Sequence, residues 1–381
     1  MMARMSGILR AQLSTAAARH NVAEVRRVVG SEVEVCAVVK ANAYGHGLDQ
    51  MVPCFTPLVD RFAVTLPPTA LRVRELGWSG PILVFFRAAG FAHSDAVADM
   101  LEKVARAEVT VTIAGQDDVE LLESVALRLA RPIEAHLKVD TGMTRSGILA
   151  TEATALVRRV RASVGIKLTG IYTQIASADG KDLTSARAQL ITFEQVLASI
   201  GETEILTIHA ANSAATVALP ESRYRMVRPG LALYGGYPSP EMARPLDLQP
   251  ILRLTAQLLE IKTVPAGSRT GYGLTHTFPT ESKIGLVSVG YADGYPRSLG
   301  GKATMAVRGQ RVPICGRVSM DQVVVDLTEV QAAQIGDEVE VIASDSSSTH
   351  SLEGLARLAD TVPYEIACGL GPRVERRLVS S

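Results

Sequence analysis

Between residues 33 and 228 the chain alternates two patterns of apolar positions. Short apolar runs predict eight strands, at 33–39, 61–66, 81–86, 109–113, 134–140, 168–174, 205–210 and 225–228. Apolar spacing near 3.6 residues predicts helices at 13–29, 69–76, 94–107, 117–130, 153–163 and 185–200. Strands and helices that alternate in this number predict a (β/α)8 TIM-type barrel.

The pattern changes near residue 240. The segment 237–250 is rich in proline and is typical of a connector. Beyond it, short runs between glycine and proline turns predict strands at 252–264, 283–291, 304–307, 312–315, 322–327 and 338–342. Only 352–360 has a helical pattern there. We therefore expect an α/β protein with an N-terminal barrel over 1–240 and a mainly β domain over 241–381.

The first strand of the barrel ends on a lysine. Residues 33–39 are apolar at nearly every position, which is typical of a parallel strand buried on both faces. Lys40 follows at the carboxyl end, where barrel enzymes carry their chemistry. A lysine that loses hydration there can be neutral near pH 7 and form a Schiff base. A lysine whose amine reaches out to solvent explains the position equally well.

Polar residues also follow other strands of the predicted barrel. Arg145 comes after the fifth strand, Ser213 after the seventh, and Arg228 and Gly230 after the eighth. The loops after strands seven and eight of such barrels often bind phosphate. Taken singly, Ser213 fits a helix cap and Arg228 to Gly230 fits a turn. Their convergence with Lys40 at one barrel end suggests pyridoxal phosphate.

Composition narrows the function classes and the compartment. The formal net charge is zero, which leaves no electrostatic signature of nucleic acid or of an anionic membrane as a partner. No apolar run reaches the ~18 residues of a membrane helix. The four cysteines form no paired motif, so we expect reduced thiols in a cytoplasmic protein. The acid-free segment 1–22 resembles a targeting peptide, or is a frayed end that runs into the first helix.

Several motifs in this order resemble those of one family. They are VVKANAYGHG (38–47), HLKVDTGMTRSG (136–147), AANSAAT (210–216), VRPGLALYG (227–235), GYG (271–273), GYADGYPR (290–297) and GRVSMDQ (316–322). With them the chain resembles alanine racemase, a pyridoxal phosphate enzyme, along nearly its whole length. The resemblance implies a homodimer in which the β domain of one subunit completes the active site of the other.

The resemblance also implies residue roles. Lys40 would hold the cofactor and act as one catalytic base, and Tyr272 of the partner subunit would be the second. Two bases on opposite faces of Cα allow one to remove its proton while the other delivers one. The implied cofactor-binding residues are Lys40, Tyr44, Arg145, Ser213, Arg228, Gly230, Leu231 and Tyr364.

Within that set, Arg228 would face the pyridine nitrogen, and Arg145 would face the phenolic oxygen of the cofactor. Arg145 and the backbone N–H of Met320 would also bind the substrate. Lys138, beside Arg145, is carbamylated in many family members, so we expect the same modification here. The implied phosphate contacts are Tyr44, Ser213, Gly230, Leu231 and Tyr364.

One position departs from the family pattern. The segment after the sixth strand usually carries a histidine that links the tyrosine base to the pyridine-facing arginine, and here it is Gln174. A glutamine can bridge the two groups but cannot titrate. A racemase of another amino acid, of broad specificity or serine type, is therefore an alternative. A non-enzymatic pyridoxal phosphate-binding protein is a third, against which the GYG and SMD segments argue.

Overall fold

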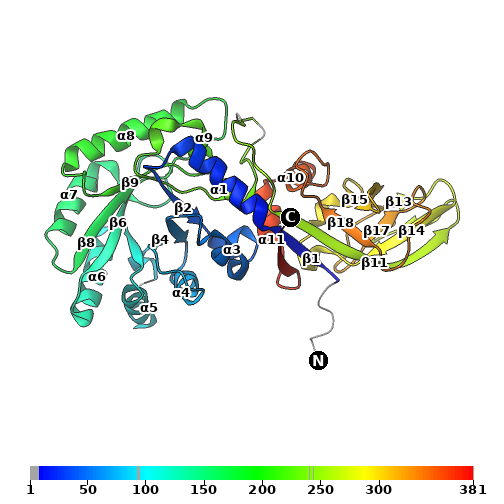
Figure 1. The fold of residues 1–381 in the computed structure, drawn as a ribbon, viewed down its shortest axis with the longest axis horizontal. Helices are drawn as coiled ribbons and strands as arrows, with labels where there is room; N and C mark the ends of the chain where they lie inside the picture. The colour runs from blue at the N-terminus through cyan, green and yellow to red at the C-terminus, as the bar shows by residue number, and fades with distance from the viewer. Residues whose placement is uncertain (1–7, 92–94, 240, 243, 381) are drawn as a thin grey trace.

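A computed structural model describes residues 8–91, 95–239, 241–242 and 244–380. It contains a strand-and-helix barrel and a mainly β domain that lie side by side (Figure 1). Helix α1 (Thr15–Val29) belongs to the barrel, whereas the strand before it reaches into the β domain.

The barrel is a parallel sheet that closes on itself. Its strands are β2 Glu34–Val38, β3 Arg61–Val64, β4 Ile82–Arg87, β5 Thr110–Ile113, β6 Ile133–Asp140, β8 Ile166–Tyr172, β9 Thr207–His209 and β10 Met226–Val227, with the short β7 Ile148–Leu149 beside β6. Strand β10 pairs with β2, and backbone hydrogen bonds from Arg225 to Ile208 and from Arg228 to Ala211 join it to the β9 segment. The predicted fold class is confirmed.

Helices surround this sheet because each has one apolar face. They are α1, α3 Leu48–Phe55, α4 Pro67–Glu75, α5 Asp95–Arg106, α6 Gln116–Leu129, α7 Ala150–Arg161, α8 Thr184–Ile200 and α9 Ser213–Ala218. In α1 the Ser14 hydroxyl caps the amino end, and Ala18, Val22 and Val25 are buried on one side. Helix α3 escaped prediction because eight residues give little periodicity. In the described part of the chain, no helix has the length and apolar character to cross a membrane.

The β domain is organised around the long strand β11 (Leu252–Val264), which pairs with β1, β14 and β18. The other strands are β12 Arg269–Thr270, β13 His276–Thr277, β14 Ser282–Val287, β15 Thr304–Val307, β16 Gln310–Pro313, β17 Val323–Asp326, β18 Glu338–Ile342 and β19 Glu375–Val379. Two helices, α10 Leu352–Ala359 and α11 Pro363–Gly369, complete the domain.

Two expectations about the chain ends are corrected. Strand β1 (Arg10–Ser14) lies between β11 and β19, so this part of the N-terminal segment is an ordered strand rather than a frayed end. Residues 1–7 lie outside the described residues. The expectation of a single helix in the β domain was wrong, because α11 follows α10. Seven residues are too few to reveal a helical period, although Pro363 at its first turn is a start signal.

Helix α11 and strand β19 of the β domain contact the barrel. The Arg376 guanidinium donates a hydrogen bond of 2.7 Å to the Gly45 carbonyl, and the rings of Tyr44 and Tyr364 lie 6.0 Å apart. Gly45 is required there, because its φ is +80° and a Cβ would collide with the Ala367 carbonyl. The β domain therefore places one side chain, Tyr364, at the carboxyl end of the barrel of its own chain.

Candidate active site

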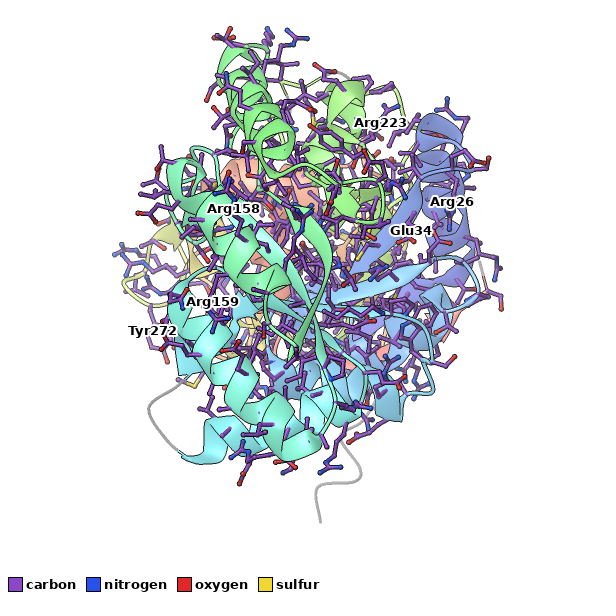
Figure 2. The ribbon with its side chains drawn as sticks, turned by 90° about the vertical axis from the view of Figure 1, so that its left-hand side faces the viewer. Arg26, Glu34, Arg158, Arg159, Arg223 and Tyr272 are labelled. Atoms are coloured by element: carbon purple, nitrogen blue, oxygen red, sulfur yellow. The ribbon has the colours of Figure 1, made fainter. Side chains whose placement is uncertain are left out.

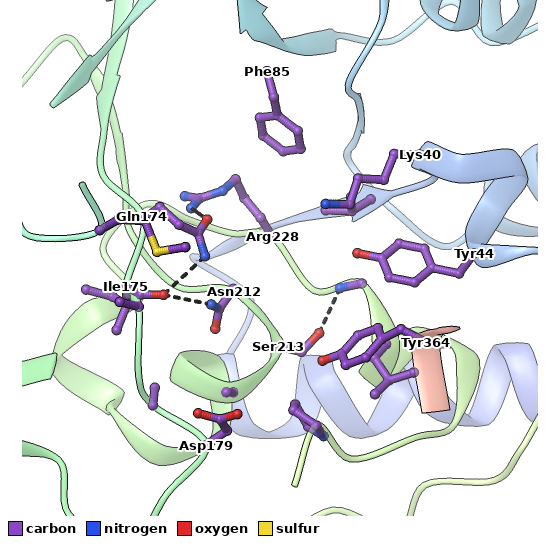
Figure 3. Close-up of a pocket in the computed structure, with 18 of the residues that line it drawn as sticks. Lys40, Tyr44, Phe85, Gln174, Ile175, Asp179, Asn212, Ser213, Arg228 and Tyr364 are labelled. Carbon is purple, nitrogen blue, oxygen red and sulfur yellow. Dashed lines mark hydrogen bonds between the residues drawn. The ribbon is translucent and has the colours of Figure 1, made fainter. Parts of the chain in front are cut away.

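A cavity lies at the carboxyl ends of the barrel strands (Figure 3). Its lining includes every residue that the sequence analysis assigned to cofactor binding: Lys40, Tyr44, Arg145, Ser213, Arg228, Gly230, Leu231 and Tyr364. Gln174, Phe85, Asn212 and Asp179 line it as well. Segments far apart in the sequence therefore meet at the end of the barrel where enzymes of this architecture place their chemistry.

A left-handed turn positions Lys40 and Tyr44. After strand β2, four consecutive residues from Ala41 to Tyr44 have φ between +51° and +55°. This conformation costs roughly 1–2 kcal/mol for each residue that is not glycine. Hydrogen bonds from the N–H of Ala43 to the Val39 carbonyl and of Gly45 to the Ala41 carbonyl close the turn. It directs the Lys40 amine and the Tyr44 ring to one cavity.

The Lys40 amine is suited to proton transfer. Burial, with a contribution from the nearby Arg145 guanidinium, lowers the pKa of Lys40 from its usual value. In Figure 3 its nitrogen points into the cavity, towards the side where Arg228 lies. A neutral amine in this position can accept a proton or form a Schiff base.

Hydroxyl groups gather on the other side of the cavity (Figure 3). They belong to Tyr44, Ser213 and Tyr364, and the Ser213 oxygen accepts a 2.8 Å hydrogen bond from the Gly230 N–H. Burial raises the pKa of both tyrosines, so their hydroxyls remain donors at neutral pH. A Cβ at Gly230 would collide with the Tyr44 hydroxyl. Donor hydroxyls around a glycine that leaves space open suit the phosphate of a cofactor.

Arg228 is buried without a carboxylate partner among the described residues. It donates instead to neutral acceptors: the His209 Nδ1 atom, the Thr173 and Ala210 carbonyls and the Gln174 side-chain oxygen. Burial lowers its pKa to about 10, so it stays charged at neutral pH. A charged donor that lacks an acid fits the ring nitrogen of a pyridoxal cofactor, which carries a lone pair.

Lys138 lies in strand β6 and does not line the cavity. Only 8% of its surface is exposed, and its Nζ atom lies 5.9 Å from the ring centre of Tyr172. Burial, together with Arg145 and Arg228, lowers the pKa of Lys138 to about 8. The loop that follows is ordered by Asp140, whose carboxylate accepts hydrogen bonds from the N–H groups of Gly142, Thr144 and Arg145. That loop brings Arg145 to the cavity.

Two expected site residues lie elsewhere in the chain. Tyr272 is 70% exposed in the β12–β13 hairpin, and Met320 is 54% exposed between β16 and β17. Figure 2 shows Tyr272 at the edge of the molecule. Neither residue lines the cavity of its own chain. Their assignment to the active site of a partner subunit therefore stays a prediction.

Sequence reasoning gave no role to Tyr172, Thr112 or His209, whose polar side chains are buried inside the barrel. The Tyr172 hydroxyl lies 3.0 Å from the Thr112 hydroxyl, and its ring stacks on His209 with 4.7 Å between ring centres. The Arg228 guanidinium lies 5.3 Å from the same ring centre. The available signal was a polar side chain, such as Tyr172 or His209, within an otherwise apolar strand.

These features define an α/β-barrel protein whose cavity carries a lysine, a buried arginine and a group of hydroxyls. Models of the alanine racemase N-terminal domain and C-terminal domain match residues 13–238 and 251–378. The chain is 36% identical to the alanine racemase of Halothermothrix orenii over 96% of this chain and 95% of that one.

Solved structures of alanine racemases superpose on this chain over nearly its whole length. The alanine racemase of the D-cycloserine-producing Streptomyces lavendulae superposes with a TM-score of 0.90, at 32% identity over 98% and 97% of the two chains. That of Bacillus anthracis with bound L-Ala-P gives 0.87, at 30% identity over 98% and 95%. The chain belongs to the alanine racemase family and is an isomerase of the racemase class.

Proposed function

We propose that the protein is a pyridoxal phosphate-dependent racemase that interconverts L- and D-alanine in the cytoplasm. The observation that carries the proposal is the convergence of the Lys40 amine, the buried Arg228 guanidinium and the hydroxyls of Tyr44, Ser213 and Tyr364 on one cavity. The names of the relatives support alanine as the substrate. The unpaired thiols of the four cysteines support the reducing compartment.

Each part of the cavity has a proposed partner on the cofactor. The Lys40 amine would hold its carbonyl carbon, Arg228 would donate to its ring nitrogen, and Arg145 would face its phenolic oxygen. Tyr44, Ser213, Gly230, Leu231 and Tyr364 would contact its phosphate. When bound, pyridoxal phosphate withdraws electrons from the substrate Cα and makes its proton acidic.

The protein supplies the two proton-transfer groups and controls where the proton returns. Lys40, with its lowered pKa, exchanges a proton on one face of Cα. Tyr272 of the partner subunit serves the other face, and Met320 of the partner subunit offers its backbone N–H to the substrate carboxylate. Arg228 does not readily release a proton, so it would leave the ring of a bound cofactor a weaker electron sink than a protonated pyridine is. With Arg228 in place, the proton would return to Cα rather than to the cofactor.

Mixed dimers test the function and the shared site together. Lys40→Ala and Tyr272→Phe should each abolish most racemisation of alanine. Lys40→Ala should also lose cofactor that borohydride can trap, and trapping retained at Lys138 would reject the lysine assignment. When both variants are co-expressed, each mixed dimer has one site with an intact pair of bases, so activity should return. Mixed dimers without activity would reject the shared site.

A substrate panel separates this proposal from a racemase of another amino acid. The wild-type protein with pyridoxal phosphate should racemise L-alanine faster than larger or polar L-amino acids, measured by chiral analysis. An absence of racemisation for every substrate would leave a cofactor-binding protein without this activity and would reject the proposal.

A further inference from the structure

Two buried histidines form a row behind Arg228. The Nη1 atom of Arg228 lies 2.7 Å from the His209 Nδ1 atom, and the His209 Nε2 atom lies 2.9 Å from the His136 Nδ1 atom. His209 belongs to β9 and His136 to β6, and both are fully buried inside the barrel. The row runs from the cavity wall into the barrel interior.

The chemistry of the guanidinium fixes the direction of every hydrogen bond in this row. Arg228 carries only donors, so the His209 Nδ1 atom must accept and cannot carry a proton. A neutral imidazole then has its proton on Nε2, which donates to the His136 Nδ1 atom. His136 in turn carries its proton on Nε2. Burial lowers the pKa of both histidines, to about 3 for His136, which keeps them neutral.

The far end of the row is unusual. The His136 Nε2 atom has no hydrogen-bond partner in the described part of the chain, although it is buried. The ring lies against Gly170 of strand β8, where a Cβ would come within 2.6 Å of that nitrogen. An apolar side chain would fill this space without the cost of an unpaired buried N–H. Packing alone therefore does not explain a histidine here.

We propose that His136 is a positioning residue, which holds the His209 ring where its Nδ1 atom accepts from Arg228 and so keeps the guanidinium aimed at the cavity. Without that acceptor, the Nε2–H of His209 would be buried and unpaired, which is costly. The ring would turn to pair this N–H elsewhere, and Arg228 would lose its Nδ1 acceptor and move. The side chain at position 136, deep in the barrel, therefore affects the position of the Arg228 guanidinium at the cavity.

The consequence for the reaction rests on the proposed function. An Arg228 guanidinium displaced from the ring nitrogen no longer limits electron withdrawal there. More protons would then return to the cofactor carbon instead of Cα. The product of that route is pyruvate, with the amino group of alanine retained on the cofactor as pyridoxamine phosphate, which is a balanced half-transamination. The ratio of pyruvate formed to alanine racemised reports the position of Arg228.

Nitrogen-15 spectra of the full chain with labelled histidine test the tautomer directly, with and without pyridoxal phosphate. His209→Gln assigns the signals. The wild-type spectrum should show His209 with a bare Nδ1 atom and a protonated Nε2 atom. A wild-type His209 with a protonated Nδ1 atom would overturn the proposal without any variant.

Two variants of similar shape separate positioning from packing. His136→Asn keeps an acceptor near the Nδ1 position, whereas His136→Leu removes it. The asparagine variant should keep the His209 nitrogen signals and a pyruvate ratio within about twofold of wild type. The leucine variant should shift the Nδ1 signal, because that atom loses the hydrogen bond from Arg228, and should raise the ratio about tenfold. If both variants keep the wild-type His209 signals and ratio, the proposal fails.

The neighbouring residue provides the matched control. Leu137 is buried and points to the opposite face of strand β6 from His136. Leu137→Val should lower the thermal stability while the His209 tautomer and the pyruvate ratio stay unchanged. A rise in the ratio for this variant too would assign the effect to general loosening of the barrel and overturn the proposal. A wild-type protein without racemisation rejects the proposed function instead, and the tautomer measurement still stands on its own.

Discussion

The Gln174 side-chain oxygen accepts a hydrogen bond of 3.2 Å from the Nη2 atom of Arg228. The amide nitrogen of the same side chain donates to the Ile175 carbonyl, also at 3.2 Å. These two contacts fix the orientation of the amide. In the family pattern, a histidine at this position links the tyrosine base to the arginine. Gln174 keeps the hydrogen bond to Arg228, but it cannot carry a proton between the two groups.

The first prediction concerns this position. Gln174→His should change the rate of alanine racemisation by less than about tenfold, or ~1.4 kcal/mol, because the hydrogen bond to Arg228 survives in either residue. Gln174→Leu is the control, and it should cost more than the histidine variant because it leaves that bond unmade. A gain in the histidine variant far beyond tenfold would show that Gln174 marks a different substrate or reaction.

The second prediction concerns Tyr272. Tyr272→Phe should lower racemisation by orders of magnitude in both directions, because each passage needs proton transfer on both faces of Cα. Exchange of the Cα proton with solvent deuterium should survive for one enantiomer only, since Lys40 still serves its own face. The family resemblance suggests D-alanine as that enantiomer. Equal loss of exchange for both enantiomers would contradict the two-base assignment. Tyr291→Phe provides an exposed tyrosine control in the same domain.

The third prediction concerns Lys138. Its pKa of about 8 gives the amine a larger neutral fraction near neutral pH than an ordinary lysine has, and the neutral amine is the form that reacts with carbon dioxide. A carbamate there would face Arg145 as an anion and replace a repulsive pair of cations. Carbon-13 spectra with labelled bicarbonate should show one carbamate signal that Lys138→Ala removes. The signal should remain in Lys167→Ala, because that amine is exposed and paired with Glu134. A signal unaffected by Lys138→Ala would refute the assignment.

The fourth prediction follows from the buried imidazoles. Burial lowers the pKa of His46 to about 4 and of His136 to about 3, against an ordinary value of 6.5. Below pH 6.5 the unfolded chain binds protons that the native chain does not, so stability falls as the pH falls towards those values. Each group contributes at most about 1.4 kcal/mol for each pH unit. Urea unfolding from about pH 7 to about pH 5 measures the slope, which should be shallower in His136→Asn. An unchanged slope in that variant would contradict the burial of a neutral His136.

The fifth prediction concerns the left-handed turn. Ala41 is exposed with φ of +51°, so Ala41→Gly relieves strain and should raise the free energy of unfolding by up to about 1 kcal/mol. The same change should loosen Lys40 and lower the racemisation rate. Ala188→Gly is the matched control in the right-handed helix α8, where it should lower stability by about 1 kcal/mol. Destabilisation by both variants would show that the turn stores no relievable strain.

The fold was largely readable from the sequence because its elements depend on local periodicity. Apolar runs and helical spacing come from the geometry of neighbouring residues, and all eight barrel strands and the long strand β11 were predicted. The elements that escaped prediction are short or have their partners far away. Strand β1 exists because it pairs with β11 and β19, more than two hundred residues away. Strand pairing over such a separation has no local signal.

The sequence by itself determined the order of elements, the place of Lys40 at a strand end and the polar residues after the later strands. Only the tertiary structure decided which of these groups face one another. It gave Arg228 neutral acceptors in place of an acid, aligned His209 with His136, and left Tyr272 away from the cavity of its own chain. The physical reason is that side-chain contacts across a barrel depend on strand register, tilt and burial over the whole domain, which no local pattern encodes.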